Sequence, residues 1–471
     1  MARRKKPLPL LQNIEIKTAG SEGKTIAHYN EKVVMITGAV PGDIVDIQIT
    51  KKRRRYLEGK PVAIHKYSDK RSEPFCEHFG LCGGCKWQNM GYEHQLFYKE
   101  QQVKDQFARI GHLEVKEWFP ILPAPDTTHY RNKLEFTFSN KKWLTIEEIQ
   151  SGQEFNRNGL GFHIPGAFDK VVDLKECHLQ NEPSNRIRQF VKDFTSKNNY
   201  SYFDLRVQEG MMRNLIIRNT EKGDVMVIVS FFYEDKPKRE ALLEALKKEF
   251  PEITALMYVI NAKKNDTLYD QDIKCFAGND FIIENLGGLD FKIGPKSFFQ
   301  TNSKQAEHLY NKALEFAGIS ENDIVYDLYS GTGTITNFIA KHAKKVIGVE
   351  QIEEAVFAAE ENSKLNKITN TLFFTGDTKD VLNPEFFKKH GKPDIIVVDP
   401  PRAGLHEKVV KEILNVAPDK FLYISCNPAT QARDLALMKD KYEILKVQPV
   451  DMFPQTHHVE NIALLQLKMN D

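Results

Sequence analysis

Residues 327–334 read DLYSGTGT, and they continue a run of β-branched and aromatic residues that begins at Ile324. Two glycines at a strand-to-helix turn let the backbone approach a ligand closely at the N-terminus of the helix. The next strand-like run ends at Glu350, about 20 residues further on, where an acidic side chain can hold ribose hydroxyls. This stretch therefore predicts the nucleotide-binding turn of a Rossmann-like sheet.

The surrounding sequence repeats the same strand-and-helix rhythm. Strand-like runs recur at 345–349, 394–398 and 420–424, and helical patterns such as residues 353–366 separate them. Alternation of this kind predicts a parallel sheet with helices on both faces.

The residues around the glycines favour one class of nucleotide over another. The third glycine of the nicotinamide pattern GxGxxG is missing. Asp327 stands before the glycines, and Asp377 follows the third strand-like run. These acidic positions fit S-adenosylmethionine better than a nicotinamide cofactor; a glycine turn without any ligand is the plain alternative.

Polar tetrapeptides follow the last two strand-like runs. Residues 399–402 read DPPR and residues 425–428 read SCNP. Ligands of open α/β sheets bind beyond the carboxyl ends of the strands, so Cys426 should emerge beside Asp399 and near a methyl donor. A lone cysteine is usually buried packing, but in this position we interpret Cys426 as a nucleophile.

A nucleophile there suits methylation of a pyrimidine carbon. Carbon 5 of uracil attacks a sulfonium poorly, whereas addition of a thiolate to carbon 6 makes an enolate whose carbon 5 can take the methyl group. A base must then remove the carbon 5 proton so that the thiolate can leave. His457, His458 and Glu460 are available, and the residues alone do not choose among them.

Five segments, in order and at suitable spacing, resemble the RlmD/TrmA family of RNA uracil-5 methyltransferases. They are residues 298–302 (FFQTN), 327–333 (DLYSGTG), 399–402 (DPPR), 425–428 (SCNP) and 457–460 (HHVE). The resemblance extends along nearly the whole chain, and it implies an enzyme that uses S-adenosylmethionine.

The resemblance also implies roles for single residues. Cys426 is expected to be the nucleophile and Glu460 the base, while Asp399 acts in catalysis and holds the uracil edge with Arg402. The side chains expected around the cofactor and target base are Gln300, Tyr329, Thr334, Glu350, Asp377 and Asp399. The chain has Tyr-Ser at 329–330, where Phe-Cys is frequent in the family, and Thr334 where Asn is frequent.

The N-terminal part of the chain is basic. Residues 1–72 hold 16 Lys/Arg against 7 Asp/Glu, a net charge of +9, whereas the remainder carries −7. Such a module suits a phosphate backbone, although a solvated surface would have the same composition; the densest run is KKRRR at 51–55. Short β-branched runs between residues 9 and 68 predict an OB-like barrel. The module resembles a TRAM domain, with PGD at 41–43 as the best local match.

Cysteines near the start of the central region predict a metal site. Cys76, Cys82 and Cys85 lie within ten residues, and Cys177 could supply a fourth thiol. Spacing alone allows Zn²⁺ or an iron–sulfur cluster about equally. The resemblance favours a [4Fe–4S] cluster, whose role would be structural or in RNA contact because methyl transfer involves no net electron transfer.

We therefore expect a multidomain α/β protein. The domains are an OB-like TRAM barrel at 7–69, a central α+β domain with the cysteine cluster at 70–280, and a C-terminal Rossmann-like methyltransferase domain at 281–471. Apolar spacing predicts a helix from Tyr92 to Ile110. The resemblance places a helix of about 92–118 against the catalytic domain, although it precedes the central domain in the chain.

Within the family that the chain resembles, a cluster and a TRAM domain together imply 23S ribosomal RNA as the substrate, with transfer RNA as the alternative. Cytosine-5 methylation, or an RNA-binding or ribosome-assembly factor without activity, are further alternatives. The target uridine is expected to be flipped out of its stack. No apolar run reaches the roughly 18 residues that span a bilayer, and the basic start lacks a signal-peptide core. We expect a cytoplasmic monomer that does not associate with membranes.

Overall fold

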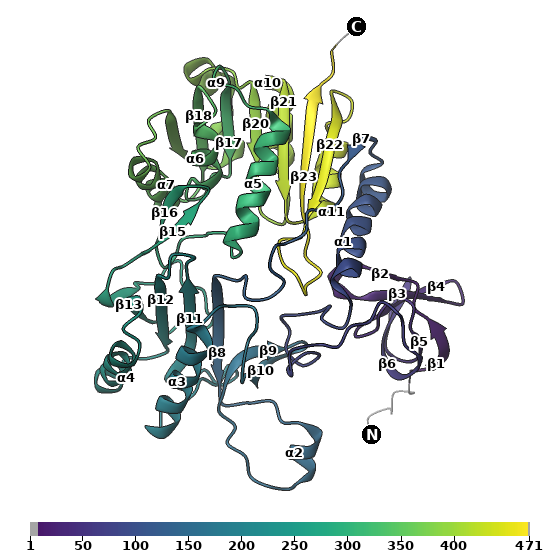
Figure 1. Cartoon of the computed structure of the whole chain (residues 1–471), viewed down its shortest axis with the longest axis vertical. Helices are drawn as coiled ribbons and strands as arrows, with labels where there is room; N and C mark the ends of the chain where they lie inside the picture. The colour runs from purple at the N-terminus through teal and green to yellow at the C-terminus, as the bar shows by residue number, and fades with distance from the viewer. Residues whose placement is uncertain (1–7, 470–471) are drawn as a thin grey trace.

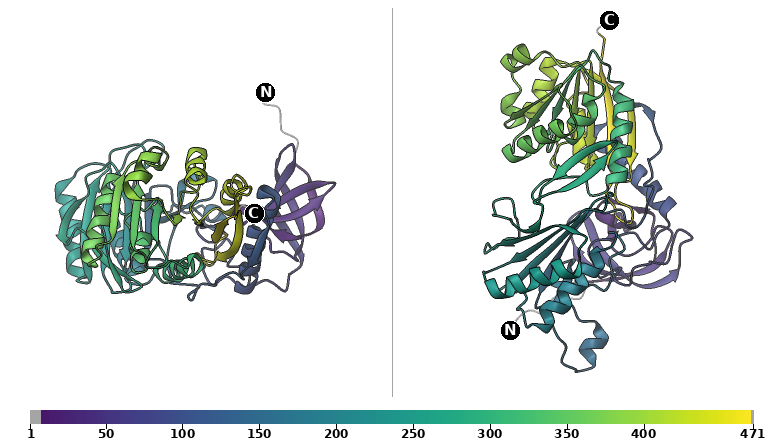
Figure 2. Two further views of the ribbon diagram at one scale, coloured as in Figure 1. Left: turned by 90° about the horizontal axis from the view of Figure 1, so that it is seen from above. Right: turned by 60° about the vertical axis from the view of Figure 1, so that its left-hand side comes forward.

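The computed structural model describes residues 8–469; Pro7 and residues 470–471, at the ends of the expected domains, lie outside this range. The C-terminal sheet occupies one end of the molecule, and the N-terminal and central sheets lie side by side at the other (Figures 1 and 2). No helix in the described range is long and apolar enough to cross a membrane.

The N-terminal sheet forms because its strands alternate buried and exposed side chains. In β5 (Ile44–Lys52) every second residue from Val45 to Ile49 is buried. Asp43, which is fully buried just before β5, accepts two hydrogen bonds of 2.8 Å from Arg71 and so ties the sheet to the segment that follows. The strand order is β1 (Leu10–Glu15), β5, β6 (Tyr56–Lys66), β4 (Lys32–Ile36), β3 (Thr25–Tyr29) and β2 (Thr18–Ala19).

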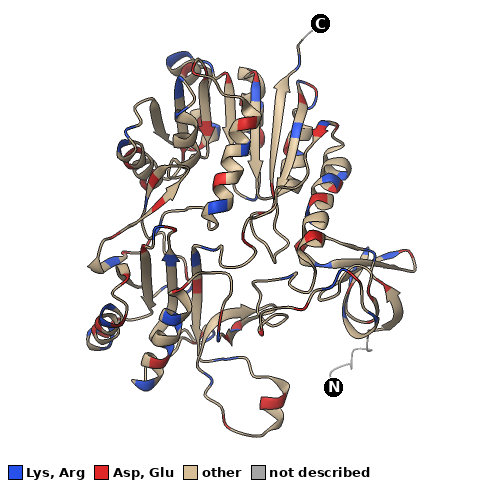
Figure 3. Cartoon of the chain, in the orientation of Figure 1, with Lys and Arg blue, Asp and Glu red and all other residues tan. Residues whose placement is uncertain are grey.

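The basic run 51–55 lies at the end of β5 and in the turn that follows, with every side chain exposed. Lys51 is 3.6 Å from Glu58 of β6. Elsewhere Lys and Arg are mixed with Asp and Glu along the chain (Figure 3). The run is therefore an accessible group of cations, as contact with a phosphate backbone requires.

The central sheet is covered on both faces. Helices α3 (Ser184–Lys197) and α4 (Lys236–Glu249) cover one face, and the hairpin of β15 (Ile282–Leu286) and β16 (Leu289–Ile293) covers the other. Burial on both faces explains why β12 reads as a nearly unbroken apolar run. The strand order is β10 (Ala167–Asp173), β9 (Gly159–Ile164), β8 (Lys133–Ser139), β11 (Met212–Asn219), β12 (Val225–Phe231), β13 (Ile253–Ile260) and β14 (Lys274–Gly278). The short helix α2 (Ile146–Gln150) projects from this sheet on a long loop (Figure 1).

The boundary expected at residue 280 falls inside a continuous core. Ile216 and Ile228 of the central sheet belong to the same buried cluster as Phe291 of the hairpin and Leu309 of α5 (Ser303–Ala317). The hairpin therefore packs against both the central sheet and α5, and the domain boundary at residue 280 stays a prediction.

The C-terminal sheet has a parallel part and an antiparallel part. Its order is β19 (Thr371–Thr375), β18 (Lys345–Glu350), β17 (Ile324–Leu328), β20 (Ile395–Val398), β21 (Lys420–Ser425), β23 (Glu460–Leu467), β22 (Tyr442–Val450) and β7 (Val115–Trp118). From β19 to β21 the strands are parallel, and the chain order reverses between β17 and β20. In such sheets the ligand site lies beyond the carboxyl ends of the strands at this reversal.

Helices cover both faces of this sheet, as its alternating pattern predicts. The helices α5 and α6 (Thr334–Ala340) pack on one face, and α1 (Tyr92–Gln106), α10 (Glu407–Val416) and α11 (Pro428–Ala436) pack on the other. Helix α7 (Glu353–Leu365) connects β18 to β19, and helices α8 (Thr378–Val381) and α9 (Pro384–His390) connect β19 to β20.

The segment 92–118 packs with the catalytic sheet but is not helical throughout. Helix α1 continues through a π-helical turn to Gly111 and stops at His112, whose φ is +47°. Val103 lies in the core beneath this sheet. Residues 115–118 form β7 instead of helix, because the edge of β22 offers unpaired backbone groups with which they pair in parallel. The expectation of helix beyond Gly111 was wrong.

Candidate active site

The turn after β17 adopts the backbone that its glycines predict. The N–H groups of Tyr329 and Ser330 donate to the carbonyl of Val349 at 2.9 and 3.1 Å. Gly333, at φ +77°, precedes α6, and a Cβ added there would lie 2.8 Å from the Cβ of Ala359. Glycine is therefore required at this position both by conformation and by space.

Glu350 ends β18 beside this turn. Its carboxylate accepts the N–H of Gly331 at 3.1 Å and the N–H of Ile352 at 3.0 Å. Carboxylate oxygens have about four acceptor sites in all, so the group can accept further hydrogen bonds from hydroxyls. The carboxylate is thus fixed next to the glycine turn.

The other expected cofactor residues surround the same turn. Thr334 begins α6, and Asp377 follows β19 and caps α8. An ion pair with Lys379 lowers the pKa of Asp377. Burial, assisted by the charge of Asp377, raises the pKa of Tyr329 to about 12. Tyr329, Glu350 and Asp377 thus lie at the carboxyl ends of the neighbouring strands β17, β18 and β19.

Gln300 approaches from the segment between β16 and α5. Its carbonyl accepts a hydrogen bond of 2.9 Å from Asn132, which also donates to Ser303 at 2.9 Å. The Gln300 segment is therefore held by a residue that directly precedes the central sheet.

Cys426 and Glu460 are brought together by the pairing of β21 with β23. Ser425 pairs with Asn461 across these antiparallel strands, so the residue after β21 and the first residue of β23 are neighbours. Asp399 follows the adjacent strand β20. Burial is the largest cause that raises the pKa of the Cys426 thiol to about 12; the charges of Glu460 and Asp399 add to it, and Arg402 opposes it.

Burial raises the pKa values of several carboxyl groups at this edge toward neutral pH. Burial raises the pKa of Asp399 to about 7. Burial, with the charge of Asp399, raises the pKa of Glu460 to about 8. Asp327, fully buried and bonded to Thr336 at 2.6 Å, also has its pKa raised to about 7 by burial. Groups with such values can take up and release protons at physiological pH.

The three candidate bases differ in their contacts and in their pKa values. The rings of His457 and His458 lie 4.1 Å apart, and Arg402 Nη2 is 3.5 Å from His458 Nδ1. Burial lowers the pKa of His457 to about 4 and that of His458 to about 3. Glu460 is the candidate whose charge acts most strongly on Cys426, which favours Glu460 as the base.

Tyr310 is a site residue that the sequence analysis missed. It lies on the buried face of α5. Burial raises its pKa well above the usual value, and the charges of Asp399, Glu460 and Asp327 raise it further. A hydrogen bond with Gln300 acts in the opposite direction. No pattern in the sequence indicates that Tyr310 belongs to the site, because an inward-facing tyrosine on an amphipathic helix is normally interpreted as a core residue.

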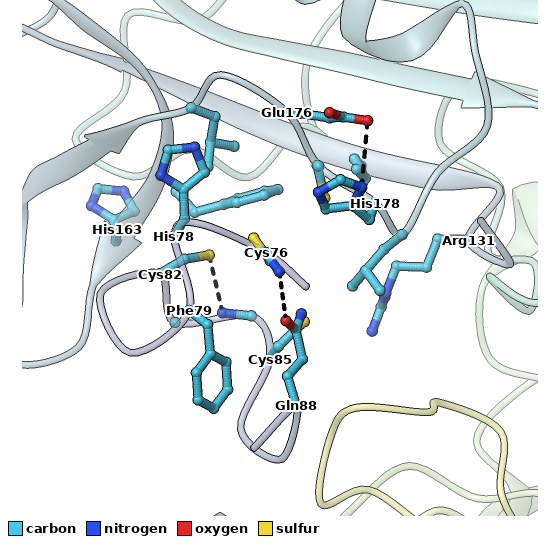
Figure 4. Close-up of a pocket in the computed structure, with 17 residues that line it drawn as sticks. Cys76, His78, Phe79, Cys82, Cys85, Gln88, Arg131, His163, Glu176 and His178 are labelled. Carbon is cyan, nitrogen blue, oxygen red and sulfur yellow. Dashed lines mark hydrogen bonds and ion pairs between the residues drawn. The ribbon is translucent and has the colours of Figure 1, made fainter. Parts of the chain in front are cut away.

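The four predicted cluster cysteines line one cavity of about 420 Å³, here called the cysteine cavity (Figure 4). Burial raises the pKa of Cys85 to about 12 and that of Cys177 to about 11, so these groups are neutral thiols unless a cation faces them. Within residues 8–469, no three His, Cys, Asp or Glu side chains converge on one point closely enough to hold a single metal ion.

Comparisons with known proteins show the family of this chain. Residues 270–468 match the family model of tRNA (uracil-5-)-methyltransferases, and residues 11–62 match that of the TRAM domain. An uncharacterized RNA methyltransferase of Bacteroides thetaiotaomicron is 52% identical over 452 residues, which cover 95% of this chain and all of the relative. A relative from Porphyromonas gingivalis with the same description is 52% identical over 96% of this chain and 99% of the relative.

One solved structure that is similar to this chain was determined with a ligand bound. The tRNA (uracil-54, C5)-methyltransferase of Pyrococcus abyssi, in complex with S-adenosyl-L-homocysteine, superposes with a TM-score of 0.74 at 26% identity. The match covers 96% of this chain and 100% of that one. The chain belongs to the RNA (uracil-5-)-methyltransferase family. The enzyme uses S-adenosylmethionine and acts on RNA, and the expected TRAM and methyltransferase folds are confirmed.

Gly333→Ala is expected to weaken S-adenosylmethionine binding. A side chain at positive φ costs about 1–2 kcal/mol, and the contact with Ala359 must also be relieved by movement of the turn. Calorimetry should show an affinity at least about tenfold lower. Gly288→Ala is the control, because Gly288 has φ +73° with open space around it, in the β15–β16 hairpin. Equal affinities in the two variants would contradict the role of the turn.

Proposed function

We propose that the enzyme forms 5-methyluridine in 23S ribosomal RNA, with Cys426 as nucleophile and Glu460 as base. The observation that carries this proposal is the pairing of Ser425 with Asn461, which makes Cys426 and Glu460 neighbours at the cofactor edge of the sheet. Covalent methylation at carbon 5 needs a nucleophile and a proton acceptor that act on the same uracil ring, and this edge of the sheet offers both.

The reaction follows from the chemistry of these side chains. The Cys426 thiol gives its proton to the carboxylate of Asp399, whose charge acts on it. The resulting thiolate adds to carbon 6 of the uracil, and the electron pair of the 5,6 double bond moves toward oxygen 4. Carbon 5 of this enolate then takes the methyl group from S-adenosylmethionine, and S-adenosylhomocysteine is released. The Glu460 carboxylate removes the proton from carbon 5, the double bond re-forms, and the thiolate leaves.

The neighbouring groups support both halves of this sequence. Asp399, with a pKa raised to about 7, can donate a hydrogen bond from its protonated form to a uracil carbonyl. Arg402 stabilises the thiolate because its charge lowers the pKa of Cys426. Tyr329, Thr334, Glu350 and Asp377 are proposed to hold the cofactor and target base, since they lie in or beside the turn that follows β17. Gln300 is proposed to join them, because it forms a hydrogen bond with Tyr310, on which the charges of Asp399 and Glu460 act.

The choice of ribosomal RNA rests on the two modules outside the catalytic sheet. The TRAM module exposes the cationic run 51–55, and the cysteine cavity lies next to it in the chain. Transfer RNA is the second candidate, because the Pyrococcus abyssi enzyme is a tRNA (uracil-54, C5)-methyltransferase.

A covalent trap tests the proposal. Fluorine at carbon 5 cannot leave as a proton does, so the enzyme should stall on 5-fluorouridine RNA after methyl transfer. We expect a gel-stable adduct with 23S fragments, lost in Cys426→Ala and retained in the control Cys275→Ala, since Cys275 is exposed on β14. An adduct with transfer RNA alone would favour the second candidate. No adduct from enzyme that binds the cofactor would indicate an inactive RNA-binding factor or another target base.

The release step should depend on pH. Glu460 acts as a base only when ionised, so below its pKa of about 8 the rate of adduct release should fall about tenfold per pH unit, and above it the rate should level off. Single-turnover release on ordinary uridine RNA measures this rate. Glu460→Gln should accumulate the adduct without this pH dependence; unchanged release in that variant would contradict the assignment of the base.

We further propose that Cys76, Cys82, Cys85 and Cys177 hold a [4Fe–4S] cluster. Four thiols around one cavity are a donor set that both iron–sulfur clusters and Zn²⁺ accept. A single Zn²⁺ needs four sulfur atoms at about 2.3 Å from one point, whereas a cavity of about 420 Å³ leaves room for a larger group. When bound, the cluster would neutralise the charge of the cysteine thiolates, and it would link the loops that carry them rigidly to one another.

Metal analysis tests the cluster. Anaerobically purified enzyme should contain about four iron atoms and sulfide per chain, with visible absorption that fades on reduction. Cys85→Ala should lose both, and Cys275→Ala should lose neither. One zinc atom per chain without iron would contradict the cluster.

A further inference from the structure

The residues before the base form a loop with an unusual set of partners. Residues 451–459 connect β22 to β23, and we call them the base loop. Val450 and Glu460, which flank this loop, pair with each other across the two strands. The conformation of the base loop therefore bears directly on the orientation of Glu460.

A buried ion pair holds the start of the base loop. Lys99 Nζ, on α1, donates to Asp451 Oδ1 at 2.5 Å and to the carbonyl of Phe453 at 3.1 Å. Both charged side chains are completely shielded from solvent. The Tyr130 hydroxyl adds a bond of 2.8 Å to the carbonyl of Pro454. Removing one member of such a pair leaves a buried charge without a partner, which strongly favours rearrangement.

A second set of bonds holds the middle of the base loop. Gln95 Nε2 donates to Gln455 Oε1 at 3.0 Å, and the Gln455 N–H donates back to Gln95 Oε1 at 2.9 Å. The N–H groups of Lys86 and Trp87 both donate to the Gln455 carbonyl, at 2.8 and 3.1 Å. The base loop is therefore fixed mainly by residues that precede the central sheet, whose first strand in the chain is β8.

The same segment contacts the RNA-binding module. The Trp87 indole donates to the carbonyl of Gly23 at 3.3 Å, and Trp87 packs in one buried cluster with Val40 and Tyr98. Lys86 directly follows Cys85 of the cysteine cavity. Residues 86–99 thus connect the N-terminal sheet and the cysteine cavity to the base loop.

We propose that Lys99, through its pair with Asp451, is a positioning residue for the proton-removal half of the reaction. This inference rests on the proposed function. The backbone of Cys426 is held between β21 and α11, whereas the base loop reaches its thiol indirectly, through the 3.5 Å contact of His458 with Arg402. Loss of the ion pair should therefore leave thiolate addition and methyl transfer intact and slow the release that Glu460 carries out.

The test uses the full-length enzyme with ordinary uridine RNA in single turnover. In Lys99→Met and in Asp451→Asn, the covalent adduct should form at the wild-type rate and be released about 10- to 100-fold more slowly, the range that a displacement of about 1 Å produces. Mass spectrometry of the trapped complex should find a methylated base on Cys426. A role in folding alone would reduce active enzyme without changing the ratio of the two rates.

Three variants guard against trivial explanations. Lys116→Met removes an exposed pair with Glu443 at the far end of β22, and Leu243→Ala destabilises the core of the central domain; both should release the adduct normally. If the single variants do not fold, Lys99→Met combined with Asp451→Leu replaces the pair by apolar side chains, a change that buried pairs often tolerate. It should show the same slow release.

The outcomes separate the two proposals. Normal release in folded Lys99 and Asp451 variants, or equal slowing of formation and release, would overturn the positioning role alone. Absence of any Cys426-dependent adduct in the wild type would instead contradict the proposed function.

Discussion

The antiparallel direction of β23 is the constraint on which the site depends. Parallel strands deliver their last residues to one edge of a sheet, and Asp399 and Cys426 reach the cofactor edge in this way. A further parallel strand would begin at the opposite edge of the sheet, and each residue of the strand adds about 3.3 Å to the distance between the two edges. Because β23 runs against β21, its first residue, Glu460, lies at the same edge as Cys426.

The same arrangement determines the electrostatics of the edge. Asp327 and Glu460 are buried beside an apolar core that contains Tyr310, and Asp399 lies at its edge. Burial raises the pKa of each carboxyl group toward neutrality. Shared burial, and not a single ion pair, makes the carboxyl groups available as acids and bases near pH 7.

Local features of the site could be predicted from the sequence, and long-range ones could not. The run 345–349 coincides with β18 because buried parallel strands are unbroken apolar runs, and the glycines of 327–334 indicated their own turn. The role of Tyr310, the strand β7 at 115–118 and the pair of Lys99 with Asp451 depend on partners far away in the chain, 352 residues apart for the ion pair. No local pattern records such contacts.

Release of tritium from carbon 5 tests the central claim most directly. RNA labelled with tritium at carbon 5 of its uridines is incubated with the enzyme and S-adenosylmethionine, and tritium in water is compared with methyl groups on RNA. Covalent methylation at carbon 5 by Cys426 and Glu460 predicts equal amounts of the two, both abolished in Cys426→Ala. Methyl transfer without release of tritium would contradict the account, because the methyl group would then lie on another atom.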